Sequence, residues 1–126
     1  MLPSPDVLQQ RIAVDVLRPS TLETLDCDQI LDERDADAAF EQAWSAARRQ
    51  LLGASGASGK TTEAIRRAAF MAVSTATHQH ELASYVSDDF ELIALASMLK
   101  VELPFVSQLW QCYERGVIPT SASMMP

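Results

Sequence analysis

Two histidines separated by one residue, His78 and His80, come nearest to a metal-binding pattern in this chain of 126 residues. Imidazole nitrogens bind zinc and other transition metals. The surrounding sequence predicts a helix, however, and residues two apart on a helix point to roughly opposite sides. The acids between Asp26 and Asp37 also lack the spacing and the closing glutamate of a calcium loop. We therefore predict no metal site.

A second stretch, Ala54–Thr61, fits the permissive form of the phosphate-binding P-loop, in which four residues separate a small residue from Gly-Lys-Thr. In such a loop backbone amides surround the phosphates, Lys60 neutralises them and Thr61 holds magnesium. A P-loop follows a buried β-strand, whereas residues 48–52 end an amphipathic helix, and the stricter pattern needs glycine at position 54. Nucleotide binding through Lys60 and Thr61 is thus a weaker alternative, and no cofactor is expected.

No set of catalytic side chains stands out. The serines lack the flanking glycines of a hydrolase elbow, and nothing resembles a Ser-His-Asp triad, although triad members can be distant in sequence. Cys27 lies between Asp26 and Asp28, whose charges oppose thiolate formation, so it should be a poor nucleophile. Cys112 stands among aromatic residues and should be packed. We predict that the chain is not an enzyme and that both thiols are reduced.

Acidic residues are concentrated in one segment. The formal net charge is −7, and residues 23–41 hold eight acids against one base, Arg34. Such a segment can bind a basic partner and repels nucleic acid, while the alternative is a solvated, acid-rich loop and helix start. The acids proposed to form a partner-binding surface are Asp26, Asp28, Asp32, Glu33, Asp35 and Asp37.

Residues 92–115 resemble the helix-turn-helix of repressor-like proteins. Apolar residues stand at the expected helix contacts, with alanine where the helices would cross: Leu95, Ala96, Leu99, Val101, Val106 and Leu109. Lys100 occupies the turn position where glycine is usual. The resemblance implies DNA binding, but phosphate contacts need cations, and only Lys100 and Arg115 are nearby. We keep DNA binding as the alternative function.

The elements that carry these residues are predicted to be helices, because alanine and leucine are abundant and β-branched residues are sparse. We predict an all-α fold, an irregular bundle of about five to seven helices. Residues 11–17 could form a helix or a strand, since Ile12, Val14 and Val16 stand at every second position, which is the spacing of one face of a strand. The expected helices cover residues 5–17, 20–25, 35–52, 61–77, 79–86, 87–100 and 104–115.

The predicted organisation is one helical domain over residues 1–118, with a flexible linker at 53–59 and a disordered tail at 119–126. We expect no signal peptide and no membrane span, because no basic start leads into an apolar run and no apolar run approaches the length of a span. The expected location is the cytoplasm. The leading hypothesis is a protein-binding or regulatory module, comparable to small inhibitor or immunity-type proteins, that uses its acidic surface against another, basic protein. The oligomeric state stays open.

Overall fold

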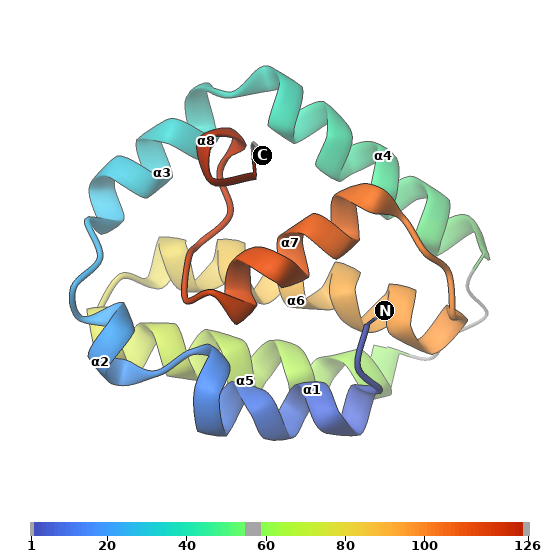
Figure 1. The fold of residues 1–126 in the computed structure, drawn as a ribbon, viewed down its shortest axis with the longest axis horizontal. Helices are drawn as coiled ribbons and strands as arrows, with labels where there is room; N and C mark the ends of the chain where they lie inside the picture. The colour runs from blue at the N-terminus through green and yellow to red at the C-terminus, as the bar shows by residue number, and fades with distance from the viewer. Residues whose placement is uncertain (1, 55–58, 125–126) are drawn as a thin grey trace.

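The computed structural model describes residues 2–54 and 59–124, and within these ranges it consists of helices without a strand (Figure 1). The predicted all-α bundle is therefore confirmed. It has eight α-helices and one π-helical turn in the described residues. In chain order these are α1 (Pro5–Arg11), η1 (Ile12–Val16), α2 (Pro19–Leu22), α3 (Cys27–Ala36), α4 (Ala38–Ala54), α5 (Gly59–Thr77), α6 (His80–Leu99), α7 (Pro104–Glu114) and α8 (Ser121–Met124).

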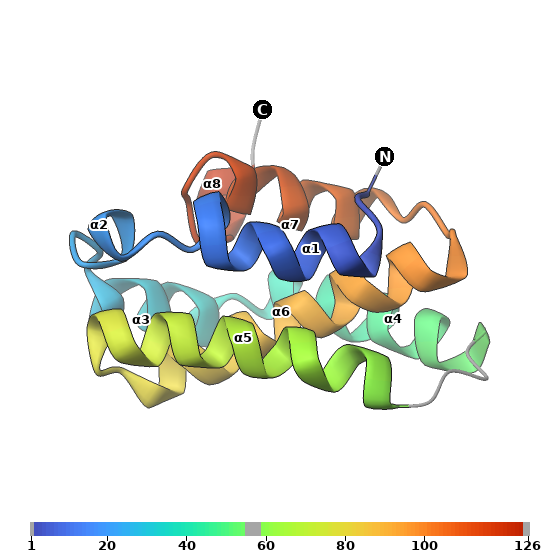
Figure 2. The same ribbon diagram turned by 90° about the horizontal axis from the view of Figure 1, so that it is seen from below.

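Helix α6 is the centre of the bundle. It runs beside α5, and α7 and α4 pack against it from other sides (Figures 1 and 2). Phe90, Leu92 and Ile93 are fully buried, as expected for a helix that is apolar around most of its circumference. The prediction that one helix ends near residue 86 and another begins at 87 is wrong, because the capping signal of Ser87-Asp88-Asp89 is overridden by tertiary partners.

The N-terminal segment is helical, which removes the strand alternative for residues 11–17. Helix α1 continues into the π-helical turn η1 without a break. Leu8, Ile12 and Val16 recur every four residues and are all buried. The four-residue spacing was thus the informative pattern, since it places these three side chains on one face of a helix. Val14, which supported the strand reading, is 73% exposed.

The predicted linker and tail differ in part from the structure. Helix α4 continues through Gly53 to Ala54 and α5 starts at Gly59, while linker residues 55–58 lie outside the described residues. In the predicted disordered tail, residues 121–124 form the short helix α8. Thr120 is buried and its hydroxyl accepts a hydrogen bond from the Ser123 amide, which caps this turn.

The turn between α6 and α7 brings together the residues that resemble a helix-turn-helix. Leu95, Ala96, Val106 and Leu109 are buried in the core, so their pattern reports helix packing. The chain changes direction by 119° between α6 and α7. Among the described residues no single helix is long and apolar enough to cross a membrane. Only α6 and α7 taken together have the length and apolar composition of a span, and they are sharply bent.

Lys100 ends α6 in the left-handed conformation, with φ of 55°. This is the turn position at which the helix-turn-helix pattern usually has glycine. The backbone of Lys100 adopts the left-handed conformation that glycine favours. The amides of Lys100 and Val101 donate to the carbonyls of Ser97 and Ala96, as at a typical left-handed helix end.

Replacing Lys100 with glycine should raise the free energy of unfolding by about 1 kcal/mol, because a residue with a Cβ pays a steric penalty in this conformation. Urea unfolding of the two proteins would measure the change. Lys100→Ala serves as the control, since it removes the charge and keeps the Cβ. A glycine variant no more stable than the alanine variant would show that the turn is not strained.

Candidate functional site

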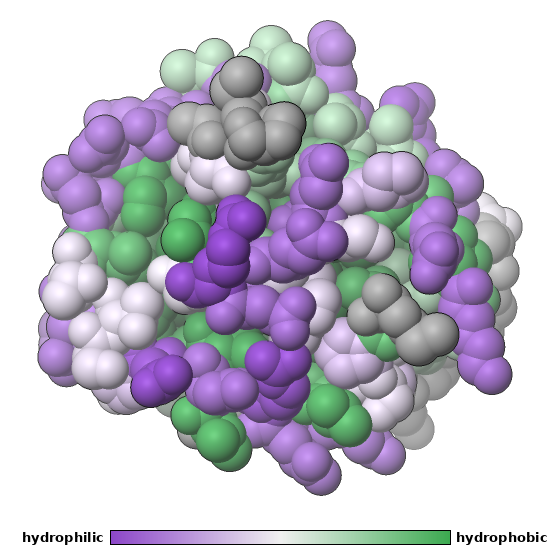
Figure 3. All heavy atoms as spheres, in the orientation of Figure 1, coloured by the Kyte–Doolittle hydropathy of each residue, from purple (hydrophilic) through white to green (hydrophobic). Residues whose placement is uncertain are grey.

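Helix α3 carries most of the predicted acidic surface. Asp26 begins the helix by accepting a hydrogen bond from the Gln29 amide, at 3.1 Å. The inward side consists of Cys27, Ile30, Leu31 and Arg34, which are buried or half-buried. The acids therefore fall on the outward side, and the outer edge of the molecule over α3 is hydrophilic (Figure 3).

The six predicted acids do not have equal roles. Asp28, Asp32 and Glu33 are exposed, and we call these three the acidic face. The first two make no hydrogen bond to another described side chain, and Glu33 accepts one from Gln29 on the same helix. These three carboxylates are the acids of α3 most available to a partner.

The other three acids of the prediction have structural partners. Asp26 caps α3, as described above. Asp37 accepts a hydrogen bond from the Phe40 amide at 3.0 Å and so caps α4. A hydrogen bond from Ser121 and the one from Phe40 lower the pKa of Asp37. Asp35 accepts a hydrogen bond from the Tyr85 hydroxyl on α6. Asp26 and Asp37 therefore fix helix ends, and Asp35 links α3 to α6, as well as adding negative charge.

A buried ion pair holds α3 against the core. The Arg34 guanidinium donates to both carboxylate oxygens of Asp89 on α6, at 2.8 and 2.9 Å. The Asp89 side chain is fully buried and that of Arg34 is 8% exposed. Trp44 of α4 and Tyr113 of α7 also donate to this carboxylate, at 3.0 and 2.6 Å. One carboxylate therefore joins four helices, and each of its oxygens accepts two hydrogen bonds.

Burial and the charge of Asp89 oppose each other in their effect on the pKa of Arg34, and act in the same direction on that of Tyr113. Burial alone would lower the pKa of the Arg34 guanidinium, but the adjacent Asp89 carboxylate outweighs it and the pKa is raised. Burial raises the pKa of Tyr113, and the charge of Asp89 raises it further. The hydrogen bond to Asp35 raises the pKa of Tyr85 to about 12, with burial as the second cause. Both tyrosines of the chain are thus held protonated.

A spectrophotometric titration should therefore show no tyrosine ionising near pH 10 in the folded protein, although both would do so in the unfolded chain. Because the folded state holds these protons more tightly, the stability that the two tyrosines contribute should be constant below about pH 10 and should fall as the pH rises toward 12. Tyr85→Phe should remove the earlier of the two steps. A phenolate appearing near pH 10 before any unfolding would contradict the hydrogen bond of Tyr85 to Asp35.

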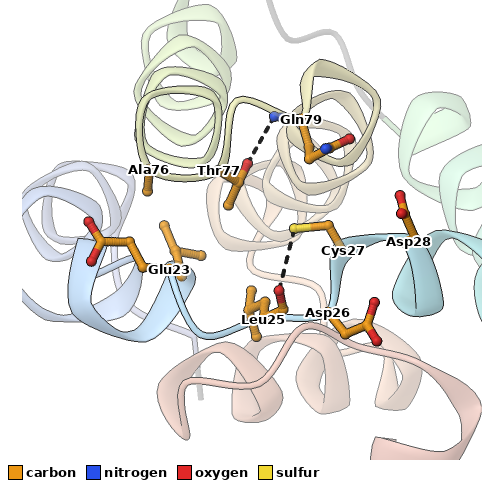
Figure 4. A pocket seen from close by; sticks show the side chains of 9 residues that line it. Glu23, Leu25, Asp26, Cys27, Asp28, Ala76, Thr77 and Gln79 are labelled. Carbon is orange, nitrogen blue, oxygen red and sulfur yellow. Dashed lines mark hydrogen bonds between the residues drawn. The ribbon is translucent and has the colours of Figure 1, made fainter.

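A hollow of about 470 Å³ lies at the start of α3, next to the ends of α2 and α5 (Figure 4). Glu23, Asp26 and Asp28 lie at its margin, and Cys27 lines it. Burial raises the pKa of the Cys27 thiol, and the charges of Asp28 and Asp26 raise it further. This agrees with the predicted poor nucleophile. The described residues that line this hollow include acids and the Cys27 thiol, but no histidine or lysine that could activate the thiol as a base.

A second hollow, of about 340 Å³, lies at the other end of α3. We call it the aromatic hollow, because three rings line it together with three carboxylates. It is formed where α3, α4 and α6 meet. Its lining residues are Arg34, Asp35, Phe40, Glu41, Trp44, Tyr85 and Asp88. The acidic face of α3 thus lies between two hollows, and both have carboxylates at their margins.

His78 and His80, for which the sequence predicted no metal site, occupy different structural positions. His78 makes the left-handed turn between α5 and α6, with φ of 57°. His80 begins α6, stacks on Phe70 and contacts the Ser74 hydroxyl through Nδ1 at 2.8 Å. Within the described residues, no group of three or more metal-binding side chains could hold an ion. The side chains of Lys60 and Thr61 lie outside the described residues, so the nucleotide alternative is not tested.

Comparison with known proteins decides the family. The model of the immunity protein PIM1 family matches residues 7–120, nearly the whole chain. The chain belongs to the immunity protein PIM1 family. No curated protein and no solved structure matches it. The matched range begins in α1 and ends just before α8, so it includes α3, both hollows and the Arg34–Asp89 pair.

Membership of the PIM1 family fits the inhibitor or immunity type of protein-binding module that the charge distribution suggested. Neither the fold nor the family supports the DNA-binding alternative, since the apolar residues of α7 are used in the core. Sequence reasoning missed the Arg34–Asp89 pair. Two signals pointed to it, namely a single arginine among eight acids and an aspartate next to Phe90 in the most apolar helix.

Proposed function

We propose that this PIM1-family protein is an inhibitor that neutralises a toxin by binding it directly, and that it is not an enzyme. Family membership over residues 7–120 carries the proposal. A toxin with a basic surface is the natural partner, because the net charge of the chain is −7. The cytoplasmic location and a partner-binding role for the six acids are predictions that go with this proposal.

The acidic face of α3 is proposed as the first contact with the toxin. Asp28, Asp32 and Glu33 are exposed, whereas Asp26, Asp35 and Asp37 also stabilise the fold. The Arg34–Asp89 pair holds the helix rigidly, so little conformational entropy would be lost on binding. Immunity by direct binding thus needs only a fixed, negatively charged surface.

The test is capture from the native host with the tagged chain, followed by growth of cells that express the captured protein. We expect the wild-type chain to capture a basic protein that is toxic alone and harmless when the chain is co-expressed. The variant Asp28→Asn, Asp32→Asn, Glu33→Gln should capture it at least tenfold more weakly, which corresponds to about 1.4 kcal/mol.

A matched control removes three exposed acids elsewhere, with Asp6→Asn, Glu63→Gln and Glu102→Gln. It changes the net charge by the same amount and should capture the toxin almost as well as wild type. Equal capture by the acidic-face variant and the wild type would reject α3 as the contact. The absence of any protection from the captured protein would reject the immunity function itself.

A further inference from the structure

The aromatic hollow at the end of α3 has a negative rim over an apolar floor. Phe40 is 5% exposed and forms part of the floor, while Trp44 and Tyr85 are half-buried and face the opening between α3, α4 and α6. Asp35 and Glu41 are exposed at the rim. A hollow of this kind combines the desolvated surface and the placed charges that bind a single anchoring side chain.

Among the described residues, Arg34 is the only basic one that lines the hollow, and it is already neutralised. The Arg34 guanidinium forms a bidentate ion pair with the buried Asp89 carboxylate, with N–O distances of 2.8 and 2.9 Å. The carboxylates of Asp35, Glu41 and Asp88 are therefore not balanced by it. Asp88 has an exposed partner in Arg66, at 3.3 Å, which is a weak and solvent-screened interaction. The hollow is left with an excess of negative charge.

The rings of the hollow are fixed in place before any partner binds. The indole nitrogen of Trp44 donates to Asp89, and the Tyr85 hydroxyl donates to Asp35. Such rings lose little freedom when a ligand packs on them. Trp and Tyr are also the side chains that most often carry binding energy at protein interfaces.

Guanidinium groups already pack on all three rings within the protein. The Arg34 guanidinium carbon lies 4.7 Å from the centre of the Phe40 ring and 5.3 Å from that of Tyr85. The Arg48 guanidinium carbon lies 5.8 Å from the centre of the Trp44 ring, and the same guanidinium pairs with Glu91. The hollow thus has the ring arrangement and the charge that a planar cation requires.

We propose that the aromatic hollow binds an arginine side chain of the toxin and is the anchor of the complex. This inference rests on the proposed function, because it assumes a protein partner with basic side chains. The incoming guanidinium would pack on Trp44 and Tyr85 and donate hydrogen bonds to Asp35 and Glu41. Arginine is preferred over lysine, since a flat guanidinium can stack on a ring while it donates to two carboxylates.

The test uses the full chain and a synthetic tetra-arginine peptide at low ionic strength, followed by nuclear magnetic resonance. The indole signal of Trp44, assigned with Trp44→Phe, should shift on titration. Tetra-lysine should bind about two- to fivefold more weakly, the difference expected from cation–π stacking at a partly exposed site. Equal affinity for the two peptides, or no shift of the Trp44 signal, would overturn the proposal.

Two variants with the same change in net charge separate the hollow from general electrostatics. Asp35→Asn, Glu41→Gln, Asp88→Asn should weaken tetra-arginine binding about tenfold, whereas neutralising Asp28, Asp32 and Glu33 should weaken it by less than about threefold. If the two variants lose the same amount of tetra-arginine affinity, the aromatic hollow is not the binding site. Such a result would leave the proposed immunity function standing, because toxin capture tests that function separately.

A third variant, Tyr85→Leu, removes one ring and leaves every charge in place. It should reduce the preference for arginine over lysine, because only the Trp44 ring remains to stack, while the fold, followed by circular dichroism, is retained. Tyr85 makes no hydrogen bond to Asp89, so the two hydrogen bonds from Arg34 to Asp89 are not removed with it, although the Arg34 guanidinium loses a ring on which it packs. An undiminished preference would show that the Tyr85 ring does not stack on the cation.

Discussion

Asp89→Ala should lower the free energy of unfolding by about 3–5 kcal/mol, the range observed when one partner of a buried ion pair is removed. The Arg34 guanidinium would be left charged in the core, with a side chain only 8% exposed. The indole of Trp44 and the hydroxyl of Tyr113 would also lose their acceptor. Urea unfolding followed by circular dichroism measures the change.

The neighbouring acid provides a control for this prediction. Asp88 pairs with Arg66 at the surface, and both side chains are more than 40% exposed. Asp88→Ala should therefore cost at most about 1 kcal/mol. If the two alanine variants are equally stable, the Arg34–Asp89 pair does not have the structural importance that its burial indicates.

A double replacement separates the cost of an unpaired charge from the value of the pair. Arg34→Met with Asp89→Leu removes both charges and fills the space with apolar atoms. We expect it to be more stable than Asp89→Ala alone, because apolar replacements of buried ion pairs are often close to neutral. A double variant that is less stable than Asp89→Ala would show that the attraction within the pair outweighs its desolvation cost.

The rate of association with the toxin should fall steeply as salt is added. Screening shortens the range of charge interactions from about 30 Å at 0.01 M to about 8 Å at physiological ionic strength. Electrostatic steering raises association rates by about ten- to a thousandfold, so a loss within that range is expected. Stopped-flow fluorescence of the captured toxin and this chain would give the rate at each salt concentration.

The acidic-face variant Asp28→Asn, Asp32→Asn, Glu33→Gln should flatten this salt dependence, while the dissociation rate changes much less. The variant with Asp6, Glu63 and Glu102 neutralised carries the same net charge and should keep most of the salt dependence. If both variants lose it equally, the total charge steers the toxin and the position of the acids on α3 is unimportant. If the association rate of the wild-type chain does not depend on salt concentration, electrostatic steering is excluded.

The helical class could be predicted because it depends on local pattern. Leu8, Ile12 and Val16 recur every four residues, and α6 is apolar around its circumference, so both helices and their burial follow from spacing. The ends of helices were less predictable. Ser87-Asp88-Asp89 has the composition of a helix start, but it lies within α6 because its side chains find partners in other helices.

The candidate site was only partly predictable for a related reason. Charge density along the chain identifies the acids of α3, since they are close in sequence. The aromatic hollow joins Asp35 to Tyr85 and Glu41, and the buried pair joins Arg34 to a residue 55 positions later. Such contacts depend on how α3, α4 and α6 cross, which a single sequence does not specify.

Helix α3 keeps its structural residue and its exposed acids on opposite sides. Arg34 points inward to Asp89, while Asp28, Asp32 and Glu33 point to solvent. Under the proposed contact of α3 with the toxin, substitutions at the three outer positions would change which toxin is recognised at little cost to folding. The arrangement would let this helix change its partner specificity while the Arg34–Asp89 pair keeps it anchored to α6.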